Sequence, residues 1–305
     1  MSLLAGLGGG GGATRVPKSR ARRGGHWWLL GPGLIYLLVF FLVPVGALLM
    51  TSLYVPVLGG AMGDFSPAFH WQNYSYAITT YWRHLVRSFV FAGIATLGAL
   101  TAGYPMAYAI AVRARRRKVL QNLLLVLVIA PFFISFILRT MAWKQILADE
   151  GPVVAALHWA HILPPDGRLT ATAFAVVCGL AYNFLPFMVL PIYANLERLD
   201  PAMLEAGADL YATPFTTFRK VTFPLSMPGV VAGTLLVFIP AAGDYINASL
   251  LGNSSDTTMI GQVINTQFTT LYNYPTSASL SAILMIVIMI MVTTYVRRSG
   301  TEELL

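Results

Sequence analysis

Six long apolar runs dominate this 305-residue sequence, and each is long enough to cross a membrane as a helix. A hydrocarbon core about 30 Å thick requires about 20 apolar residues at a rise of about 1.5 Å each. Composition agrees, because 56% of the residues are hydrophobic, only 10% are charged and the mean hydropathy is +0.67. The sequence therefore predicts an all-α membrane protein. The expected spans are approximately 27–53, 84–112, 119–147, 169–195, 228–251 and 277–296.

Several prolines fall inside these runs. A transmembrane bundle tolerates such prolines, because neighbouring helices and side chains satisfy the carbonyl groups that they free. We therefore treat each run as one uninterrupted span. The prolines concerned are Pro44, Pro105, Pro131, Pro186, Pro191 and Pro240.

The distribution of Lys and Arg predicts the orientation of the spans. Fifteen of the 20 basic residues lie in the segments 1–26, 113–118, 198–220 and 297–305. The positive-inside rule therefore places these segments, and with them both termini, in the cytoplasm. The net charge of +8 is explained by this topology, and nucleic-acid binding is not expected.

The first 26 residues are rich in glycine and then basic, and we expect a disordered arm. They could be mistaken for the start of a signal peptide. However, the apolar run at 27–53 is longer than a signal-peptide core and has no clear small-residue cleavage site. We expect an uncleaved first span, with 297–305 as a short cytoplasmic tail.

The sequence gives little support for a metal site or a disulfide bond. The single cysteine, Cys178, excludes an intrachain disulfide and is most simply a packed residue. His158 and His161 are spaced to share a helix face, but no third ligand is evident, so we interpret them as interfacial. We expect no metal and no cofactor in this chain.

The polar segment between the fourth and fifth runs is longer than a turn requires. Asp200-Pro201 and Thr213-Pro214 each combine a capping side chain with proline at the first helical position. Phe223-Pro224 predicts the end of the second helix. The segment 200–224 is thus expected to form two short helices against the membrane. The second would place Phe215, Phe218 and Thr222 on one face.

The first of these helices, 202–211, has the composition of a docking surface. Its small residues 206–208 would let a partner approach closely, and the flanking charges of Glu205 and Asp209 would orient it. A solvated connector between two spans is the alternative. Physical reasoning favours docking.

The same stretch resembles the cytoplasmic signature of ABC importer permeases, which runs Glu-Ala-Ala, three residues, Gly, nine residues, Ile-x-Leu-Pro. Glu205-Ala206-Gly207 and Val221-Thr222-Phe223-Pro224 match with small changes, and Pro228-Gly229 follows. Tyr211 departs from the pattern, because the family usually has Gly there. A bulky ring at this turn could change its angle.

Two further stretches narrow the family. Pro131–Leu147 and Gly233–Asn253 resemble the third and fifth spans of spermidine/putrescine permeases, and the resemblance extends from about Leu97 to Val296. It implies a six-helix bundle of the type I ABC importer permease kind, with a short cytoplasmic coupling helix, in a bacterial inner membrane. The coupling residues that it implies are Glu205, Ala206, Gly207, Asp209, Leu210, Tyr211 and Pro214.

The resemblance also implies partners. ATP and Mg would bind a separate ATPase subunit, present in two copies, beside a second permease subunit, an external solute-binding protein and membrane lipid. The sequence agrees, because it has no G-x-x-x-x-G-K-[ST] phosphate-binding loop. We therefore expect a transport subunit and not an enzyme.

A charged residue within a span is costly and is a candidate functional site. Asp244, beside Tyr245, would suit an ammonium group through ion pairing and cation–π attraction. An internal ion pair with Arg139 is the alternative. Trp143, Tyr182 and Asn183 are weaker candidates to line the same cavity. The expected solute is a polyamine or a similar small cation, with an opine, a sugar-amine or an amino-acid-like solute as alternatives.

Two other classes of protein are less favoured. A self-sufficient secondary transporter or channel would favour more intramembrane carboxylates and inverted repeats. An intramembrane enzyme would need paired catalytic groups at membrane depth. The five histidines all lie at the ends of runs or between them: His26, His70, His84, His158 and His161.

Overall fold

The computed structural model describes residues 25–57, 59–164, 166–200, 202–203, 209, 211–252 and 254–298. Most of the predicted N-terminal arm and C-terminal tail therefore lies outside the described residues. The chain divides into two compact units, residues 1–47 and 48–305, and each is described by itself.

Helix α1 (Gly25–Thr51) supplies the described part of the first unit and ends in the second. Its stretch from Leu30 to Thr51 is strongly apolar, and none of the most apolar part of this stretch is buried within the described chain. Because large apolar side chains point outward all around it, lipid or another chain must cover this helix.

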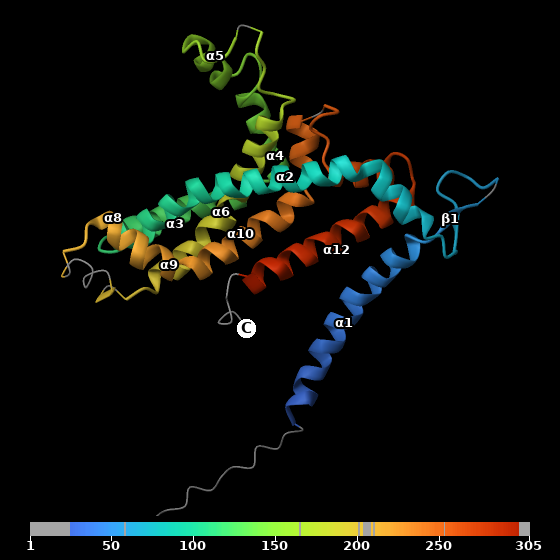
Figure 1. The fold of residues 1–305 in the computed structure, drawn as a ribbon, viewed down its shortest axis with the longest axis horizontal. Coiled ribbons are helices and arrows are strands. Elements are labelled where there is room, and N and C mark those ends of the chain that lie inside the picture. Colours follow the sequence, from blue (N-terminus) through green and yellow to red (C-terminus); the bar gives the residue numbers. More distant parts are fainter. Residues whose placement is uncertain are drawn as a thin grey trace, which may run out of the picture. The chain divides into compact units, whose positions relative to one another are not determined.

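Helices α2 (Gln72–Tyr108), α6 (Ala173–Glu197) and α10 (Met227–Ala242) form the core of the second unit (Figure 1). Small residues let these helices approach each other closely, as is usual in membranes. A Cβ atom at Gly103 would lie 3.1 Å from Met188 Cγ, and one at Gly233 would lie 2.9 Å from Met188 Sδ. Met188 of α6 is therefore packed between two glycines.

The final helix, α12 (Tyr274–Arg298), packs against α2 and the short helix α11 (Ile260–Thr269). A small hairpin pairs β1 (Val55–Pro56) with β2 (Phe65–Ser66) in antiparallel fashion. These pieces gather at the end of the unit where α2 and α12 begin.

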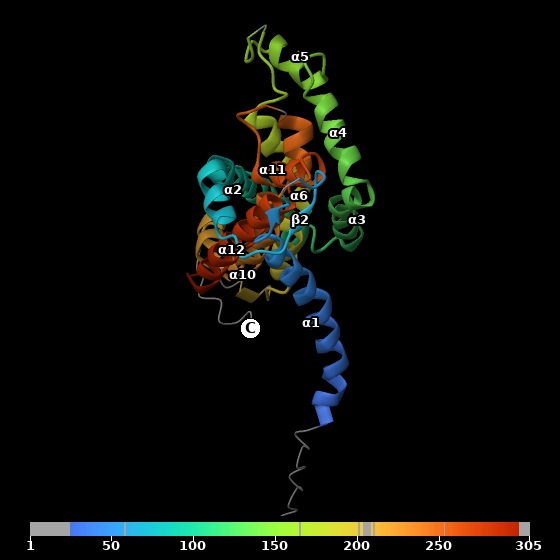
Figure 2. The ribbon, with the colours of Figure 1, turned by 90° about the vertical axis from the view of Figure 1, so that its right-hand side faces the viewer.

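The third run differs from the uninterrupted span that the sequence predicts. Helix α3 (Lys118–Ile129) passes into a 3₁₀ turn, η2 (Ala130–Phe133), and α4 (Phe136–Ile146) then leaves at 97° (Figure 2). Pro131 occupies the start of the 3₁₀ turn, and Ser135 is extended with ψ 135°. The missing N–H of the proline and this extended residue break the helix. A short helix, α5 (Pro152–Trp159), follows.

The fifth run is also interrupted. Helix α10 ends at Ala242, a turn holds Asp244, and a π-helical turn, η4 (Ala248–Gly252), follows. The continuous helix expected to Leu251 therefore stops early. The carboxylate of Asp244 accepts a hydrogen bond from the backbone N–H of Asn247 and so caps the next turn.

The segment before α10 is helical but bent. It consists of α8 (Pro214–Thr217), the π-helical turn η3 (Phe218–Thr222) and α9 (Phe223–Leu225), and it meets α10 at 63°. Among the described residues, four helices are long and apolar enough to span a membrane, or up to six if each bent pair counts as one span. The predicted number of six spans is therefore reached only when each bent pair is counted as one span.

Candidate functional site

Four polar residues meet where α4, α6 and the turn after α10 come together, and with Arg139, the neighbour of Thr140 on α4, we call them the buried polar cluster: Arg139, Thr140, Asn183, Asp244 and Asn247. All are at most 8% exposed. Asn183 Nδ2 donates to Thr140 Oγ1 at 3.0 Å and to Asn247 Oδ1 at 2.9 Å. Hydrogen bonds therefore join three separate segments at one point within the apolar bundle.

Asp244 carries a negative charge that no basic side chain neutralises in the described residues. Its Oδ1 accepts the N–H of Asn247 at 2.7 Å. The ion pairs among described residues join Lys118 to Glu197 and Arg168 to Asp149. A buried carboxylate with hydrogen bonds but no counter-ion is costly and favours a cationic ligand.

Arg139 is the opposite case, a buried cation. Its Nε and Nη1 atoms have no hydrogen-bond partner among the described residues, and its guanidinium lies 5.6 Å from the ring centroid of Phe136. The ion pair with Asp244 that the sequence left open is not formed. The break near Pro131 redirects α4, and the end of α10 turns Asp244 towards Asn247. The ion pair was left open on the expectation that each run is one uninterrupted span, and neither of these two runs is.

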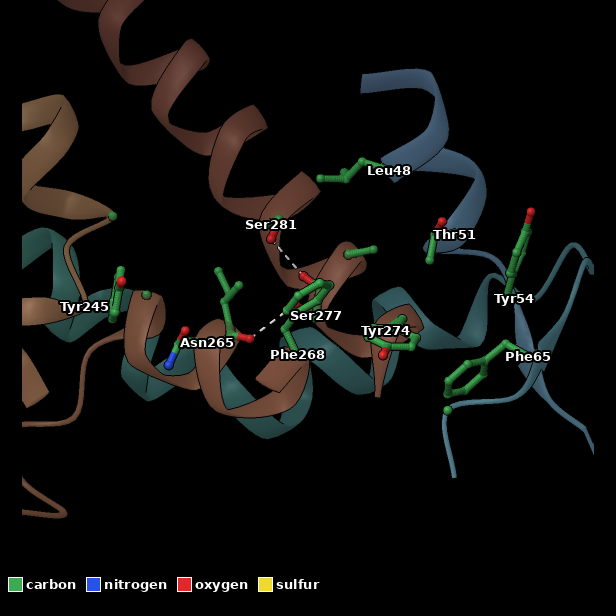
Figure 3. Close-up of a pocket in the computed structure, with 15 residues that line it drawn as sticks. Leu48, Thr51, Tyr54, Phe65, Tyr245, Asn265, Phe268, Tyr274, Ser277 and Ser281 are labelled. Atoms are coloured by element: carbon green, nitrogen blue, oxygen red, sulfur yellow. Dashed lines mark hydrogen bonds between the residues drawn. The ribbon is translucent and has the colours of Figure 1, made fainter. Parts of the chain in front are cut away.

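The predicted aromatic residues separate into two places. Trp143 of α4 and Tyr182 of α6 pack edge to face with ring centroids 5.2 Å apart. Tyr245 instead lines a cavity of about 900 Å³ near α11 and α12 (Figure 3). The structure thus links Asn183 to Asp244 through Asn247 and places Arg139 next to Thr140 on α4, while Tyr245 lines a different space.

Sequence reasoning missed Thr140 and Asn247. Thr140 Oγ1 donates to the carbonyl of Phe136 at 3.0 Å and lies 3.4 Å from Asn247 Oδ1. Both are polar residues within apolar runs, next to or near a charged residue of the cluster. That placement was the available signal, since buried polar groups are nearly always hydrogen-bonded.

In the 200–226 segment, the structure confirms both predicted helix caps. Asp200 Oδ1 accepts the N–H of Ala202 at 2.9 Å, and Thr213 Oγ1 accepts the N–H of Thr216 at 3.2 Å. Pro214 begins α8, and Asp209 is helical and exposed. The other proposed coupling residues, Glu205, Ala206, Gly207 and Leu210, lie outside the described residues.

Tyr211 keeps a backbone conformation that glycine usually supplies. Its φ is +56°, in the left-handed region, and its side chain is 97% exposed. Glycine adopts this conformation without strain and commonly ends helices in this way. The turn that precedes α8 therefore has a glycine-type geometry despite the tyrosine.

The second short helix does not stop at Phe223-Pro224, as the sequence predicts, but continues to Leu225. The π-helical turn η3 precedes it, so Pro224 stands at the start of a new helical turn, where its missing N–H is not needed. The register also differs from a regular helix. Phe215 is 71% exposed, whereas Thr222 is buried, so they do not share one face.

Aromatic packing anchors this helix to α2. The ring of Phe218 meets those of Tyr104 and Tyr108 edge to face, with centroids 5.7 and 5.8 Å apart. The hydroxyl groups of Tyr104 and Ser226 are hydrogen-bonded at 2.7 Å, and Ser226 is fully buried. A displacement of this helix is therefore transmitted directly to the core.

Fold, bent spans and the 200–226 segment together define a transport permease. A family model for the binding-protein-dependent transport system inner membrane component matches residues 97–299, and the chain belongs to this family. It is a multi-pass inner-membrane permease subunit of an ABC importer.

Individual relatives agree. The chain is 38% identical over 219 residues to the spermidine/putrescine transport system permease protein PotB of Escherichia coli (strain K12), covering 72% of this chain and 78% of that protein. It is 31% identical over 234 residues to the inner membrane ABC transporter permease protein YdcU of the same strain, covering 72% of each.

Solved structures support the fold alone. A bacterial ABC transporter involved in the import of the acidic polysaccharide alginate superposes with a TM-score of 0.66 at 16% identity, covering 90% of this chain and 96% of that chain. The MetNI methionine ABC transporter gives a TM-score of 0.56, also at 16% identity, over 71% and 93%. The type I permease architecture is therefore shared across different solutes.

Proposed function

We propose that this chain is one of two permease subunits in an ATP-driven importer of a polyamine or a similar small organic cation. The observation that carries the proposal is the buried carboxylate of Asp244, which has no counter-ion among the described residues. The similarity to PotB over most of the chain supports the same class of solute.

In this proposal both termini and the 200–226 segment face the cytoplasm, as the positive-inside rule predicts. Asp244 then lies towards the outer end of the pathway. When the importer opens outward, an ammonium group pairs with the carboxylate and supplies the counter-ion that the described residues lack. Closure and inward opening then release the cation.

Energy enters through partner subunits. Two copies of an ATPase subunit bind ATP and Mg, and one of them contacts the coupling residues from Glu205 to Pro214. The anchored helix at 214–225 passes the movement to α2, because Phe218 and Ser226 are held by Tyr104. An external solute-binding protein delivers the solute, and a second permease subunit completes the pathway.

The unpaired guanidinium of Arg139 supports a second candidate solute. A zwitterion, such as an amino-acid-like molecule or an opine, would place a carboxylate near Arg139 and an ammonium group near Asp244. For a purely cationic solute, an acidic residue of the second permease subunit must instead neutralise Arg139.

The complete importer, reconstituted in vesicles, distinguishes these solutes. We expect ATP-dependent uptake of radiolabelled spermidine, a loss of at least about 10-fold with Asp244→Asn, and no loss with the exposed control Asp256→Asn. Uptake of a zwitterion and not of spermidine by the parent would contradict the polyamine proposal. Equal losses for cationic and neutral solutes with Asp244→Asn would assign the carboxylate a structural role.

The coupling role has its own test. Reversing the charge with Glu205→Arg should leave the importer assembled and able to hydrolyse ATP, but should separate hydrolysis from uptake. The matched control is Arg219→Glu, which reverses an exposed charge on the neighbouring helix. Normal spermidine uptake by Glu205→Arg would remove Glu205 from the coupling surface.

A further inference from the structure

A cavity of about 900 Å³ lies where α12 begins, apart from the buried polar cluster. Aromatic side chains from four segments line it: Tyr54, Phe65, Tyr245, Phe268 and Tyr274 (Figure 3). Tyr274 is the central ring, and the centroids of Phe65 and Phe268 lie 5.9 and 5.2 Å from its own, both in edge-to-face geometry. This volume is in the range of small-molecule sites.

The lining is mostly apolar and carries hydroxyl groups but no charge. Among the described residues that line the cavity, none is acidic or basic. The hydroxyl groups of Ser277 and Ser281 donate to the carbonyls of Ile264 at 3.2 Å and Ser277 at 2.8 Å. Their oxygen atoms remain as acceptors. Aromatic faces and acceptor oxygens attract an organic cation, and no cationic group is present to attract an anion.

Hydrogen bonds hold the walls in place. Asn73 Nδ2 donates to the carbonyls of Ser52 at 2.9 Å and Tyr54 at 3.0 Å, which fixes the start of the hairpin against α2. The backbone N–H of Ile260 donates to the buried hydroxyl of Ser88 at 2.7 Å, which fixes α11. The cavity is therefore formed before any ligand binds, and the ordering cost of binding is small.

The cavity and the carboxylate share one turn of the chain. Gly243 and Tyr245 line the cavity, and Asp244 stands between them. Helix α11 approaches this turn so closely that a Cβ atom at Gly261 would lie 2.9 Å from the carbonyl oxygen of Asp244. A ligand in the cavity thus lies beside the peptide that carries the charge of the buried polar cluster.

We propose that this aromatic cavity is a second, outer binding site for an alkylammonium solute, occupied before the solute reaches Asp244. The inference rests on the proposed import of an organic cation. One ammonium group lies against the rings around Tyr274, and the methylene chain extends over Ile264 towards Tyr245. A lipid acyl chain or a segment of the second permease subunit is the competing occupant.

Spermidine binding to the complete importer in lipid nanodiscs tests this site. Phe65→Leu and Tyr274→Leu keep the side chains apolar but remove a π face, and each should weaken spermidine binding about 10-fold. The matched control is Tyr36→Leu on α1, a ring outside the cavity, which should change nothing. Unchanged affinity in both cavity variants would overturn the proposal.

Chemical protection locates the ligand independently of transport. In a Cys178→Ser background, Asn265→Cys places one thiol on the cavity wall. Saturating spermidine should slow its alkylation by a water-soluble maleimide about 10-fold. Thr79→Cys, on an exposed face of α2, should be alkylated at an unchanged rate.

The outcomes separate the two proposals. If the parent imports spermidine but Asn265→Cys is not protected, the outer site is wrong and the import function stands. If native mass spectrometry finds a lipid retained in the parent, and absent from Tyr274→Leu, at saturating spermidine, the cavity is a lipid site. If the parent neither binds nor imports spermidine, both proposals fall.

Discussion

The two bent helix pairs of this permease are built in opposite ways. The bend between α3 and α4 is 97° and runs through an exposed stretch, in which Phe133 is 88% and Ile134 53% exposed. The bend between α9 and α10 is 63° and centres on Ser226, which is fully buried. One bend therefore lies open to its surroundings, and the other is enclosed by the core.

The enclosed bend is also fully hydrogen-bonded. The N–H of Ser226 donates to the carbonyls of Thr222 and Phe223, and its hydroxyl group bonds to Phe223 O and to Tyr104. The open bend instead has an extended backbone at Ile134 and Ser135. The comparison teaches that a buried, satisfied bend transmits movement as a rigid elbow, whereas an exposed, extended one can change its angle.

The largest expected effect lies at the rigid elbow. A Cβ atom at Gly229 would lie 2.8 Å from the carbonyl oxygen of Pro191 and from Asn195 Cβ, so Gly229→Leu must push α10 away from α6. We expect a loss of about 3 kcal/mol in the free energy of unfolding and no measurable uptake. Thermal unfolding in detergent and vesicle uptake measure both effects.

Gly93→Leu is the matched control, because Gly93 lies on α2, another of the three central helices, and nothing lies within 4 Å of a Cβ atom there. It should change the unfolding temperature little. If Gly229→Leu behaved like Gly93→Leu, the contact between α10 and α6 would be loose. The bend between α9 and α10 would then not be rigid, and the contrast between the two bends would be wrong.

A smaller effect of opposite sign is expected at Arg139, on the helix that follows the open bend. Arg139→Met keeps most of the side-chain volume and removes a buried charge with unpartnered nitrogen atoms. The isolated subunit should gain about 2 kcal/mol in the free energy of unfolding, while assembly with the second permease subunit weakens. Thermal unfolding of the isolated subunit and co-purification of the pair measure these changes.

Arg83→Met is the control for this change, because Arg83 also lies 5.6 Å from an aromatic ring, that of Trp82, but is exposed. It should alter stability by less than about 0.5 kcal/mol. A loss of stability in isolated Arg139→Met would show that the guanidinium is compensated within this chain. Arg139 would then not need an acidic residue of the second permease subunit to neutralise it.

The two bends also mark the limits of what the sequence could predict. Apolar runs and basic loops predicted a helical membrane protein. The thickness of the bilayer sets the length of each span, and the positive-inside rule relates the basic loops to the side of the membrane. The caps at Asp200 and Thr213 were predicted for a similar reason, since each depends on three or four adjacent residues. Sequence rules were therefore reliable where the contacts that determine the structure lie between residues close together in the chain.

The sequence failed where a distant partner decides the geometry. Nothing near Pro131 indicates a 97° bend in place of a tolerated kink, and nothing near Asn247 indicates that it bonds to Asn183 of another helix. Because Asp244 lies in a turn and caps it at Asn247, the expectation of an uninterrupted fifth span could not place Asp244 relative to Arg139. The candidate site was predicted as a set of residues but not as an arrangement.

The smallest expected effect concerns Tyr211, which precedes the helix that leads into the rigid elbow. Its left-handed backbone costs about 1 kcal/mol relative to glycine, but glycine also makes the unfolded chain more flexible. Tyr211→Gly should therefore stabilise the turn by only about 0.5 kcal/mol. Amide hydrogen exchange at Ala212 and Thr213 measures this local change.

Tyr211→Ala separates the backbone from the ring, because alanine retains the strain and lacks the exposed aromatic group. If the ring contacts the ATPase subunit, both variants should reduce uptake alike while their hydrogen exchange differs. If only the turn geometry matters, Tyr211→Gly should transport like the parent. A rigid bend passes on a small change in the turn that precedes it, whereas a bend that can change its angle does not. The two variants therefore test whether the bend at Ser226 is rigid.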